Sequence, residues 1–396
     1  MSEMLIFAAM IILISVFGIA EYFYHQHNLR SIAIRVHVNG TRGKSSVTRL
    51  IAAGLRAGGI RTVAKTTGTL PRVIAPDGTE YPVYRRSRPN IIEQIRIVAF
   101  AARNQAKALV IECMALQPYL QSLCELRLIR STHGVITNAR EDHLDVMGPS
   151  ERDVALALLG TTPVGSILFT CEKDYREEFE RACRLRGSRL EVVSDEDLAF
   201  VTDEDLAAFS YLEHRENVAL ALNVCASLGV SKRIALEAMK QVRPDPGALS
   251  DVSVDFFGRR IHFVNGFAAN DPESSGMIWR MALDRHPDAE RRIMVINSRI
   301  DRPHRSRQIG ESLARWQPAD RYIMIGSGSY FVTHYATRAG IEARYFTIAE
   351  DFETEHIFEE ILRYCRKRSL VVGIGNIAGP GLELVTYFHN RSATAA

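Results

Sequence analysis

The chain has 396 residues, of which 46% are hydrophobic and 24% are charged, and its formal net charge is +3. These fractions are typical of folded globular proteins, so they exclude a disordered, collagen-like or low-complexity chain. The small net charge, with arginines spread along the whole sequence, argues against nucleic acid as a partner. At about 100–200 residues per domain, we expect two domains, or three.

The first predicted element is an apolar helix at the N-terminus. Residues 4–20 carry no charge, and a membrane-spanning helix needs about 17–25 mostly apolar residues. The first basic residues after this stretch are Arg30 and Arg35, and basic residues favour the cytoplasmic side. We therefore expect residues 1–24 to form a single-pass anchor in the cell membrane, with the rest of the chain in the cytoplasm. The alternatives are a signal peptide, which normally begins with a basic region absent here, and a buried or partner-binding helix.

After the anchor, short apolar runs alternate with helical patterns. This alternation is typical of an α/β domain with a mainly parallel sheet. The predicted strands are residues 32–38, 107–112, 133–138 and 165–170, and two consecutive helices are predicted at 213–229 and 231–242.

A second α/β domain is predicted after the run Pro244-Asp245-Pro246-Gly247, because proline and glycine break regular structure. The alternation then restarts, with predicted strands at 261–265, 292–297, 321–325 and 370–374. We expect a first domain over 25–247 and a smaller, Rossmann-like domain over 248–396.

The six cysteines do not indicate a metal or disulfide framework. None forms a C-x-x-C pair, and none lies in a His/Cys cluster with zinc spacing. We expect reduced thiols, most of them buried.

The motif that carries most chemistry is residues 39–46 (NGTRGKSS), between a predicted strand and a predicted helix. Backbone N–H groups of such a turn, together with the helix N-terminus, bind phosphate. We expect Lys44 to reach the β- and γ-phosphates of ATP and the Ser45 hydroxyl to coordinate Mg²⁺. The full phosphate-loop pattern is not met, because Val38 stands where its first glycine belongs. A purely structural turn is the alternative.

Two further candidates follow predicted strands. Glu112 ends a strand, where open α/β sheets place ligand-binding groups, and a carboxylate suits the Mg²⁺ of a nucleotide. His143 lies between two carboxylates in residues 142–145 (DHLD). The alternatives are a helix N-terminal charge for Glu112 and a structural histidine for His143.

These motifs resemble those of the Mur ligase superfamily, which comprises ATP-dependent amide ligases of peptidoglycan synthesis and folate polyglutamylation. Glu112 matches the magnesium-binding glutamate of that superfamily, and His143 matches the histidine of its D-H-L-D motif, which serves a second magnesium. The resemblance implies that Lys44, Glu112 and His143 are catalytic and that Ser45, Glu112 and His143 bind metal. It also implies nucleotide-binding roles for the loop residues Gly40, Thr41, Arg42, Gly43, Lys44, Ser45 and Ser46.

Three more matches extend this resemblance. Asn217 matches the second asparagine of an H-N-x-x-N motif near the nucleotide. Residues 267–272 (FAANDP) look like the Y-A-H-N-P segment of the C-terminal domain, and Asp301 with Arg302 falls where the superfamily has a D-R pair. The resemblance thus adds Asn217, Asn270 and Arg302 to the nucleotide-binding residues. It implies a Mur-ligase-like parallel-sheet ATPase domain with a phosphate loop, a smaller Rossmann-like domain, and an active site between the two.

A narrower resemblance is to the ligase subunits of bacterial poly-γ-glutamate synthases. It runs to about residue 390 and rests on the anchor and seven motifs in order: residues 40–46, 65–69, 112–115, 141–149, 244–248, 264–271 and 373–377. It implies ATP and Mg²⁺ as cofactors, and glutamate and the growing polyglutamate chain as substrates joined through an acyl phosphate. It further implies other membrane subunits of a synthase as partners and allows a homo-oligomer.

The chain departs from Mur ligases after the D-H-L-D histidine. These ligases commonly carry a carbamylated lysine shortly after the D-H-L-D histidine, whereas residues 156–158 here are Leu-Ala-Leu and the next lysine is Lys173. Two other functions stay open at this point. One is an amide ligase that adds glutamate to another acceptor such as folate, and the other is a membrane-tethered ATPase switch that makes no bond.

Overall fold

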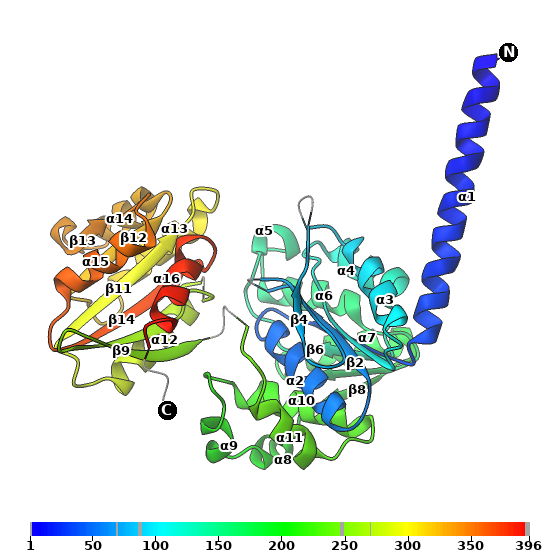
Figure 1. The fold of residues 1–396 in the computed structure, drawn as a ribbon, viewed down its shortest axis with the longest axis horizontal. Helices are drawn as coiled ribbons and strands as arrows, with labels where there is room; N and C mark the ends of the chain where they lie inside the picture. Colours follow the sequence, from blue (N-terminus) through cyan, green and yellow to red (C-terminus); the bar gives the residue numbers. More distant parts are fainter. Residues whose placement is uncertain (1, 69, 86–88, 246–248, 270, 393–396) are drawn as a thin grey trace. The chain divides into compact units, whose positions relative to one another are not determined.

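The computed structural model describes residues 2–68, 70–85, 89–245, 249–269 and 271–392. The chain divides into two compact units, residues 1–243 and 244–396. Each unit contains one sheet with helices packed against it (Figure 1). The α/β class predicted from the sequence is therefore confirmed. The predicted boundary between residues 247 and 248 lies outside the described residues.

The N-terminal helix α1 (Ser2–Ser31) extends away from the first sheet (Figure 1). Its large apolar side chains are exposed from Met4 to Phe23. By length and composition, α1 could cross a membrane. The helix does not end at residue 24, and its last two turns are docked on the first unit. There the His25 ring nitrogen Nε2 lies 3.0 Å from the carbonyl oxygen of Leu128, and Leu29 is 3% exposed.

The first unit is built on an eight-stranded sheet with the order β4-β3-β2-β5-β1-β6-β7-β8. Strands β2, β5, β1, β6, β7 and β8 run parallel, and β3 and β4 form an antiparallel edge. The strands are β1 (Ile34–Asn39), β2 (Thr62–Thr66), β3 (Arg72–Ile74), β4 (Glu80–Pro82), β5 (Ala108–Glu112), β6 (His133–Ile136), β7 (Ile167–Thr170) and β8 (Arg189–Val192).

Helices cover both faces of this sheet. Every residue of β5 is buried, and because successive side chains of a strand point to opposite faces, both faces must be covered. Helix α3 packs Ile97 and Val98 against Leu109 and Ile111, while α2 contacts β2, β5, α10 and α11. The helices are α2 (Lys44–Ala57), α3 (Glu93–Arg103), α4 (Pro118–Leu123), η1 (Cys124–Ile129), α5 (Leu144–Met147), α6 (Glu151–Leu158), η2 (Leu159–Thr161), α7 (Arg176–Arg186), α8 (Asp195–Phe200), α9 (Asp203–Ala207), α10 (Arg215–Ser227) and α11 (Lys232–Lys240).

Four strands of the first unit, β1, β5, β6 and β7, were predicted from apolar runs, and their positions agree with the prediction to within two residues. The prediction missed the other four. Strands β3 and β4 have only three residues each, β2 (TVAKT) has three polar residues in five, and β8 (RLEV) carries two charged residues in four. Such short or polar strands lack the apolar run on which the prediction depended.

The second unit has a six-stranded sheet with the order β13-β12-β11-β14-β10-β9. All neighbouring pairs are parallel except β9 with β10, which form an antiparallel hairpin. The strands are β9 (Ser250–Phe256), β10 (Arg259–Asn265), β11 (Arg291–Ser298), β12 (Arg321–Gly326), β13 (Phe346–Ile348) and β14 (Arg368–Gly375). The helices are α12 (Pro272–Arg285), α13 (Pro303–Leu313), α14 (Ser329–Arg338), η3 (Ala343–Tyr345), α15 (Thr354–Tyr364) and α16 (Pro380–His389). The sequence predicted β10, β11, β12 and β14 but not β9 or β13.

Candidate functional site

The candidate site lies at the carboxyl edge of the first sheet, where β1 stands between β5 and β6. The parallel register pairs Val38 with Glu112 and Asn39 with Ile136. The three strands therefore end side by side. This brings the loop after β1, the carboxylate of Glu112 and the segment after β6 to one edge of the sheet, which is where open α/β sheets bind ligands.

The loop between β1 and α2 has a backbone that only glycine adopts easily. Gly40 has φ +132° and Gly43 has φ +80°, and both values are unfavourable for residues with a side chain. Gly43 is the N-cap of α2 and supplies no side-chain cap. The first N–H groups of α2 are therefore not satisfied by a cap side chain, an arrangement suited to binding a phosphate.

Side chains that follow β6 hold this loop in place. The Thr41 hydroxyl donates to Asn138 Oδ1 at 2.7 Å, and the backbone N–H of Arg42 donates to the same oxygen at 3.1 Å. The Thr137 hydroxyl donates to the carbonyl oxygen of Arg42 at 2.6 Å. The loop conformation is thus set by tertiary contacts and not by the glycines alone.

Lys44 lies across the loop that precedes it. Its ammonium group donates to the carbonyl oxygen of Gly40 at 2.6 Å and to that of Thr41 at 3.2 Å. The positive charge is therefore held beside the backbone amides of the loop. Amides and ammonium together form a site of positive potential that attracts anions.

Ser45 and Glu112, two of the predicted metal ligands, are in direct contact. The Ser45 hydroxyl donates to Glu112 Oε2 at 2.8 Å, and the backbone N–H of Thr67 donates to the same oxygen at 2.6 Å. Glu112 is 2% exposed. Hydroxyl and carboxylate oxygens are the hard ligands that Mg²⁺ prefers, so this pair fits a magnesium ion bound beside a nucleotide phosphate.

Lys65 and Glu93 form an ion pair in the interior of the first unit, near Glu112. The Lys65 ammonium is 2.7 Å from Glu93 Oε1, and the Gln94 amide donates to the carbonyl oxygen of Glu112 at 3.1 Å. Burial lowers the pKa of Lys65, while the nearby carboxylates of Glu93 and Glu112 act against that effect. This layer fixes the strand end that carries Glu112. The sequence analysis assigned Lys65 only to a family motif.

Asn217, at the start of α10, lies against the loop of residues 40–46. A Cβ atom added at Gly43 would lie 2.7 Å from Asn217 Oδ1. The Asn217 amide donates to Glu213 Oε1 at 2.8 Å, and the hydroxyl of Ser46 donates to Glu213 Oε2. Glu213 thus connects the loop to α10. The Tyr211 hydroxyl also donates to Glu213 at 3.0 Å. Burial, together with the charge of this carboxylate, raises the pKa of Tyr211. Sequence analysis missed Glu213, because its contact with Ser46 joins segments far apart in the chain.

His143 lies on the segment that follows β6. It is the N-cap of α5 and has φ +47°, a left-handed conformation that non-glycine residues seldom adopt and that often marks a functional position. Its Nε2 atom is 3.9 Å from Asp142 Oδ1, and its side chain is 22% exposed. Ser45 and Glu112 touch each other, whereas His143 comes to the same edge from a separate segment.

The region that lacks the lysine of Mur ligases contains a buried carboxylate. Ala157 and Leu158 belong to the apolar core under α6, and the Lys173 ammonium donates to Asp195 Oδ1 at 2.8 Å on the surface. Glu172, after β7, is 8% exposed and accepts a hydrogen bond from the backbone N–H of Ala139 at 2.8 Å. Glu172 was not predicted, although it lies two residues after a predicted strand and a carboxylate at a strand end is the signal that singled out Glu112.

In the second unit, the structure describes one of the two predicted nucleotide-binding residues. Asn270 lies outside the described residues. Arg302 is the N-cap of α13 and lines a small pocket at the carboxyl ends of β11 and β14. The other polar side chains of that pocket are Asn297, Ser298, Arg299, Arg305, Ser306 and Asn376.

Comparison with known proteins identifies both units by sequence. Residues 38–205 match the profile of the Mur ligase middle domain. Residues 252–391 match that of the poly-gamma-glutamate synthase CapB C-terminal domain.

Two curated relatives cover most of the chain. The capsule biosynthesis protein CapB of Bacillus anthracis is 37% identical over 372 residues, which are 93% of this chain and 79% of that protein. The PGA synthase CapB of Bacillus subtilis (strain 168) is 34% identical over 388 residues, 98% of this chain and 97% of that protein. Among solved structures, FolC of E. coli in complex with ADP has the same fold, with a TM-score of 0.70 and 14% identity over 93% of this chain and 92% of that one.

Proposed function

This chain belongs to the poly-gamma-glutamate synthase CapB family of ATP-dependent amide ligases, and we propose that it holds ATP on the loop of residues 40–46 while it joins glutamates through an acyl phosphate. The observation that carries the proposal is the contact at 2.8 Å between Ser45 and the buried Glu112, beside a helix N-terminus without a side-chain cap. Hard oxygen ligands next to a phosphate-binding loop suit a nucleotide with its divalent metal.

The proposed reaction has two steps. A γ-carboxylate oxygen of glutamate attacks the terminal phosphorus of ATP, the bond to the β-phosphate oxygen breaks, and ADP leaves. The amine nitrogen of another glutamate then attacks the acyl carbon, the bond from that carbon to the phosphate oxygen breaks, and phosphate leaves as the amine loses a proton. Phosphorylation is required because a carboxylate alone is a poor electrophile.

The residues of the first unit act on this reaction by position and charge. Lys44 neutralises negative charge on the transferring phosphoryl group, and the amides of residues 40–43 hold the phosphates in place. Asn217 orients the nucleotide from the α10 side of the loop, where it lies against Gly43. In the second unit we assign Arg302 and Asn270 to the nucleotide as well.

Magnesium fits the oxygen atoms present and, when bound, supplies positive charge to the phosphates. We assign Ser45 and Glu112 to one ion, because their oxygen atoms already lie together. We assign His143 to a second ion on the strength of its position after β6 and its strained backbone. We assign no role at this ion to Lys173, the next lysine in the sequence, since it pairs with Asp195 on the surface.

We further propose that α1 anchors the chain in the cell membrane, with both units in the cytoplasm. The exposed apolar side chains from Met4 to Phe23 support this proposal, as do Arg30 and Arg35 at the end that would face the cytoplasm. Synthesis at the cytoplasmic face would pass the growing polyglutamate chain to other membrane subunits. A second copy of the chain is a further candidate partner.

The ligase proposal is tested by measuring ATP turnover and polymer formation together. The full-length protein in membranes is supplied with ATP, Mg²⁺ and labelled glutamate, and ADP and acid-stable γ-linked product are measured. We expect ADP release to depend on glutamate, and both products to be lost in Lys44→Ala. Lys107→Ala is the matched control, because Lys107 is an exposed lysine of the same unit and its loss should change neither product.

Two other outcomes would contradict the proposal. Release of ADP that is indifferent to glutamate, without polymer even after membranes containing the partner subunits are added, would identify an ATPase switch. Stimulation of ADP release by folate, with glutamate transferred to it, would identify another acceptor.

The membrane proposal is tested with charges in the middle of α1. Leu13→Arg combined with Phe17→Arg should move the protein from the membrane fraction to the soluble fraction, because an arginine at the centre of a bilayer costs about 3 kcal/mol on insertion scales. His27→Arg, on the exposed side of the docked part of the helix, should leave the distribution unchanged. If the double variant stayed in the membrane fraction, α1 would not be the anchor.

A further inference from the structure

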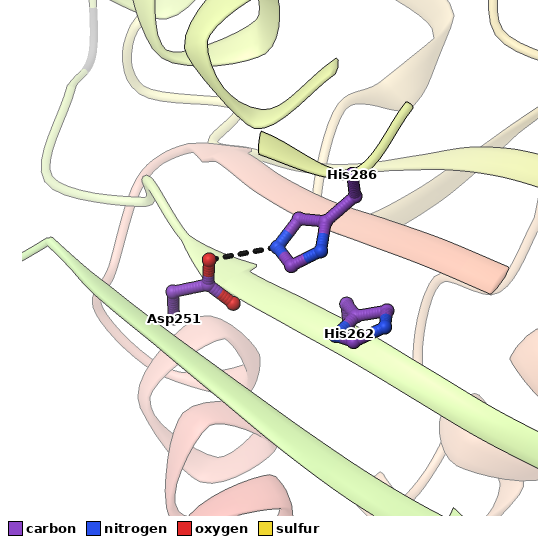
Figure 2. Close-up of side chains that lie close together, drawn as sticks. All are labelled: Asp251, His262 and His286. Carbon is purple, nitrogen blue, oxygen red and sulfur yellow. Dashed lines mark hydrogen bonds and ion pairs between the residues drawn. The ribbon is translucent and has the colours of Figure 1, made fainter. Parts of the chain in front are cut away.

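Three metal-ligating side chains meet in the second unit, in a place that the ligase mechanism does not use. One ligand atom from each of Asp251, His262 and His286 lies within 4.8 Å of the other two (Figure 2). All three side chains are partly buried. They come from β9, β10 and the end of α12, so the group exists only in the folded unit.

The hairpin register places two of these residues on one face. Val264 pairs with Asp251, and His262 pairs with Ser253. Because alternate residues of a strand point the same way, Asp251, Ser253 and His262 share a face of the hairpin. Val264 on that face packs in the core with Ala282 and Leu283 of α12, which brings the end of α12 over the hairpin.

His286 is the C-cap of α12, and Pro287 follows it directly. A proline cannot continue a helix, so the chain turns away at this residue. The His286 ring is thereby held at the rim of the core, where its Nε2 atom lies 2.8 Å from Asp251 Oδ2. The rings of His262 and His286 are stacked, with centroids 4.1 Å apart and planes at 25°.

His262 is prepared to act as a neutral ligand. The Ser253 hydroxyl lies 2.9 Å from its Nδ1 atom, and a partner at one ring nitrogen is what orients metal-binding histidines. Burial, followed by the neighbouring His286, lowers the pKa of His262, while Asp251 and Asp288 act in the opposite direction. The neutral imidazole, which is the form that binds metal, is therefore favoured.

We propose that Asp251, His262 and His286 bind a divalent transition-metal ion of the zinc type, which links the β9–β10 hairpin to the end of α12. Two imidazoles and one carboxylate are the donor set of sites with three protein ligands and an open position. Imidazole selects zinc, nickel or copper over magnesium. The site is therefore chemically different from the all-oxygen pair Ser45 and Glu112, and it does not depend on the proposed ligase activity.

The distances indicate how the site would close on an ion. Zinc lies about 2.0–2.2 Å from nitrogen and oxygen ligands, so two ligand atoms of a tetrahedral site are about 3.3 Å apart. The distance of 2.8 Å between His286 Nε2 and Asp251 Oδ2 would lengthen slightly on binding. Any other distance between two ligand atoms that approaches the limit of 4.8 Å would shorten. In the stacked arrangement, the two ring planes do not both point at one ion position. Turning one imidazole about its side-chain bonds would let both rings face the ion.

The test is metal binding to the full-length, untagged protein in detergent, since a histidine tag would bind the same ions. Saturating Mg²⁺ and ADP occupy the oxygen ligands of the first unit. Co²⁺ is titrated and followed by its visible absorption, and Zn²⁺ is then added to displace it. We expect one equivalent of Co²⁺ to bind, and Zn²⁺ at equal concentration to remove it.

Variants assign the ligands. Asp251→Asn keeps a hydrogen-bond acceptor for His286 and should fold. Both Asp251→Asn and His262→Ala should weaken Co²⁺ binding about tenfold or more. Ser253→Ala, which removes the partner of the His262 ring, should weaken it about tenfold. His356→Ala is the matched control, an exposed histidine of the same unit, and should bind like the wild type. Absence of Co²⁺ binding to the wild type would overturn the proposal. Binding of undiminished strength in both Asp251→Asn and His262→Ala would also overturn it.

Discussion

Two strand-to-helix junctions of this chain start with the same three residues, Val-Asn-Gly, at 38–40 in the first unit and at 264–266 in the second. In both, the valine and asparagine end a strand whose last three residues are buried, and the asparagine is at most 2% exposed. They differ where the helix begins. The N-cap of α2 is Gly43, without a side-chain cap, whereas the N-cap of α12 is Asp271, whose carboxylate accepts from the backbone N–H of Ser274 at 2.8 Å.

We infer that the strand and its Val-Asn-Gly turn alone do not make an anion site. A helix N-terminus attracts negative charge. At α12 that charge is already supplied by the protein's own carboxylate. At α2 the N-cap is glycine, so no cap side chain accepts from the first backbone amides and an anionic ligand can do so. Lys44 adds a positive charge beside them. We therefore expect phosphate binding at such a junction to need both an N-cap without a carboxylate and a lysine beside the first amides.

Making the first junction resemble the second should have the largest effect. Gly43→Asp places a carboxylate at the N-cap of α2, where φ is +80° and a Cβ atom would lie 2.7 Å from Asn217 Oδ1. The carboxylate would repel the phosphates, so we expect nucleotide affinity, measured by calorimetry with ADP, to fall about a hundredfold or more. Gly59→Asp is the matched control, because Gly59 has φ +78° but nothing within 4 Å of its Cβ position. Equal affinity in both variants would disprove the role of the open N-cap.

Glu112→Gln tests the metal ligand without removing its shape. The amide oxygen of glutamine can still accept from Ser45 and Thr67, so stability should change little, but the negative charge is lost. We expect the Mg²⁺ concentration for half-maximal ATP turnover to rise about tenfold or more, because Mg²⁺ prefers carboxylate oxygens. Glu141→Gln, on an exposed residue of the same edge, should leave that concentration unchanged. The same result for both variants would remove Glu112 from the metal site.

The sequence predicts the phosphate loop and Glu112 because each is a local signal attached to the end of an apolar strand. Parallel neighbours in one sheet then bring such strand ends together without further information. Glu213 could not be predicted, since its contact with Ser46 spans 167 positions of the chain. The group Asp251, His262 and His286 could not be predicted either. It depends on the register of β9 against β10 and on where α12 ends over the hairpin. The alternation of polar and apolar residues in β9 indicates a strand but not its partner.

The glycines of the two junctions allow a direct comparison of stability. Gly40 has φ +132°, and a Cβ there would lie 2.0 Å from Thr137 Oγ1. Gly266 has no positive φ, and its Cβ would lie 2.9 Å from the carbonyl oxygen of Gly373. Gly40→Ala combines backbone strain with a clash and should lower the free energy of unfolding by about 3 kcal/mol. Gly266→Ala adds only overpacking and should cost about 1 kcal/mol. Thermal melting of both variants measures the difference, and an equal loss would show that φ at residue 40 is not strained.

The smallest effect is expected from opening the second junction. Asp271→Ala removes the cap of α12 and should lower the free energy of unfolding by about 1 kcal/mol, while Asp271→Asn, which can still accept the Ser274 N–H, should cost much less.

If the N-cap alone made an anion site, Asp271→Ala would also bind inorganic phosphate, measured by calorimetry with the first unit saturated by Mg²⁺ and ADP. We expect no such binding, because the described residues of this junction include no lysine in the position that Lys44 takes in the first. Phosphate binding by Asp271→Ala would mean that the open N-cap suffices and that Lys44 serves the transfer step alone.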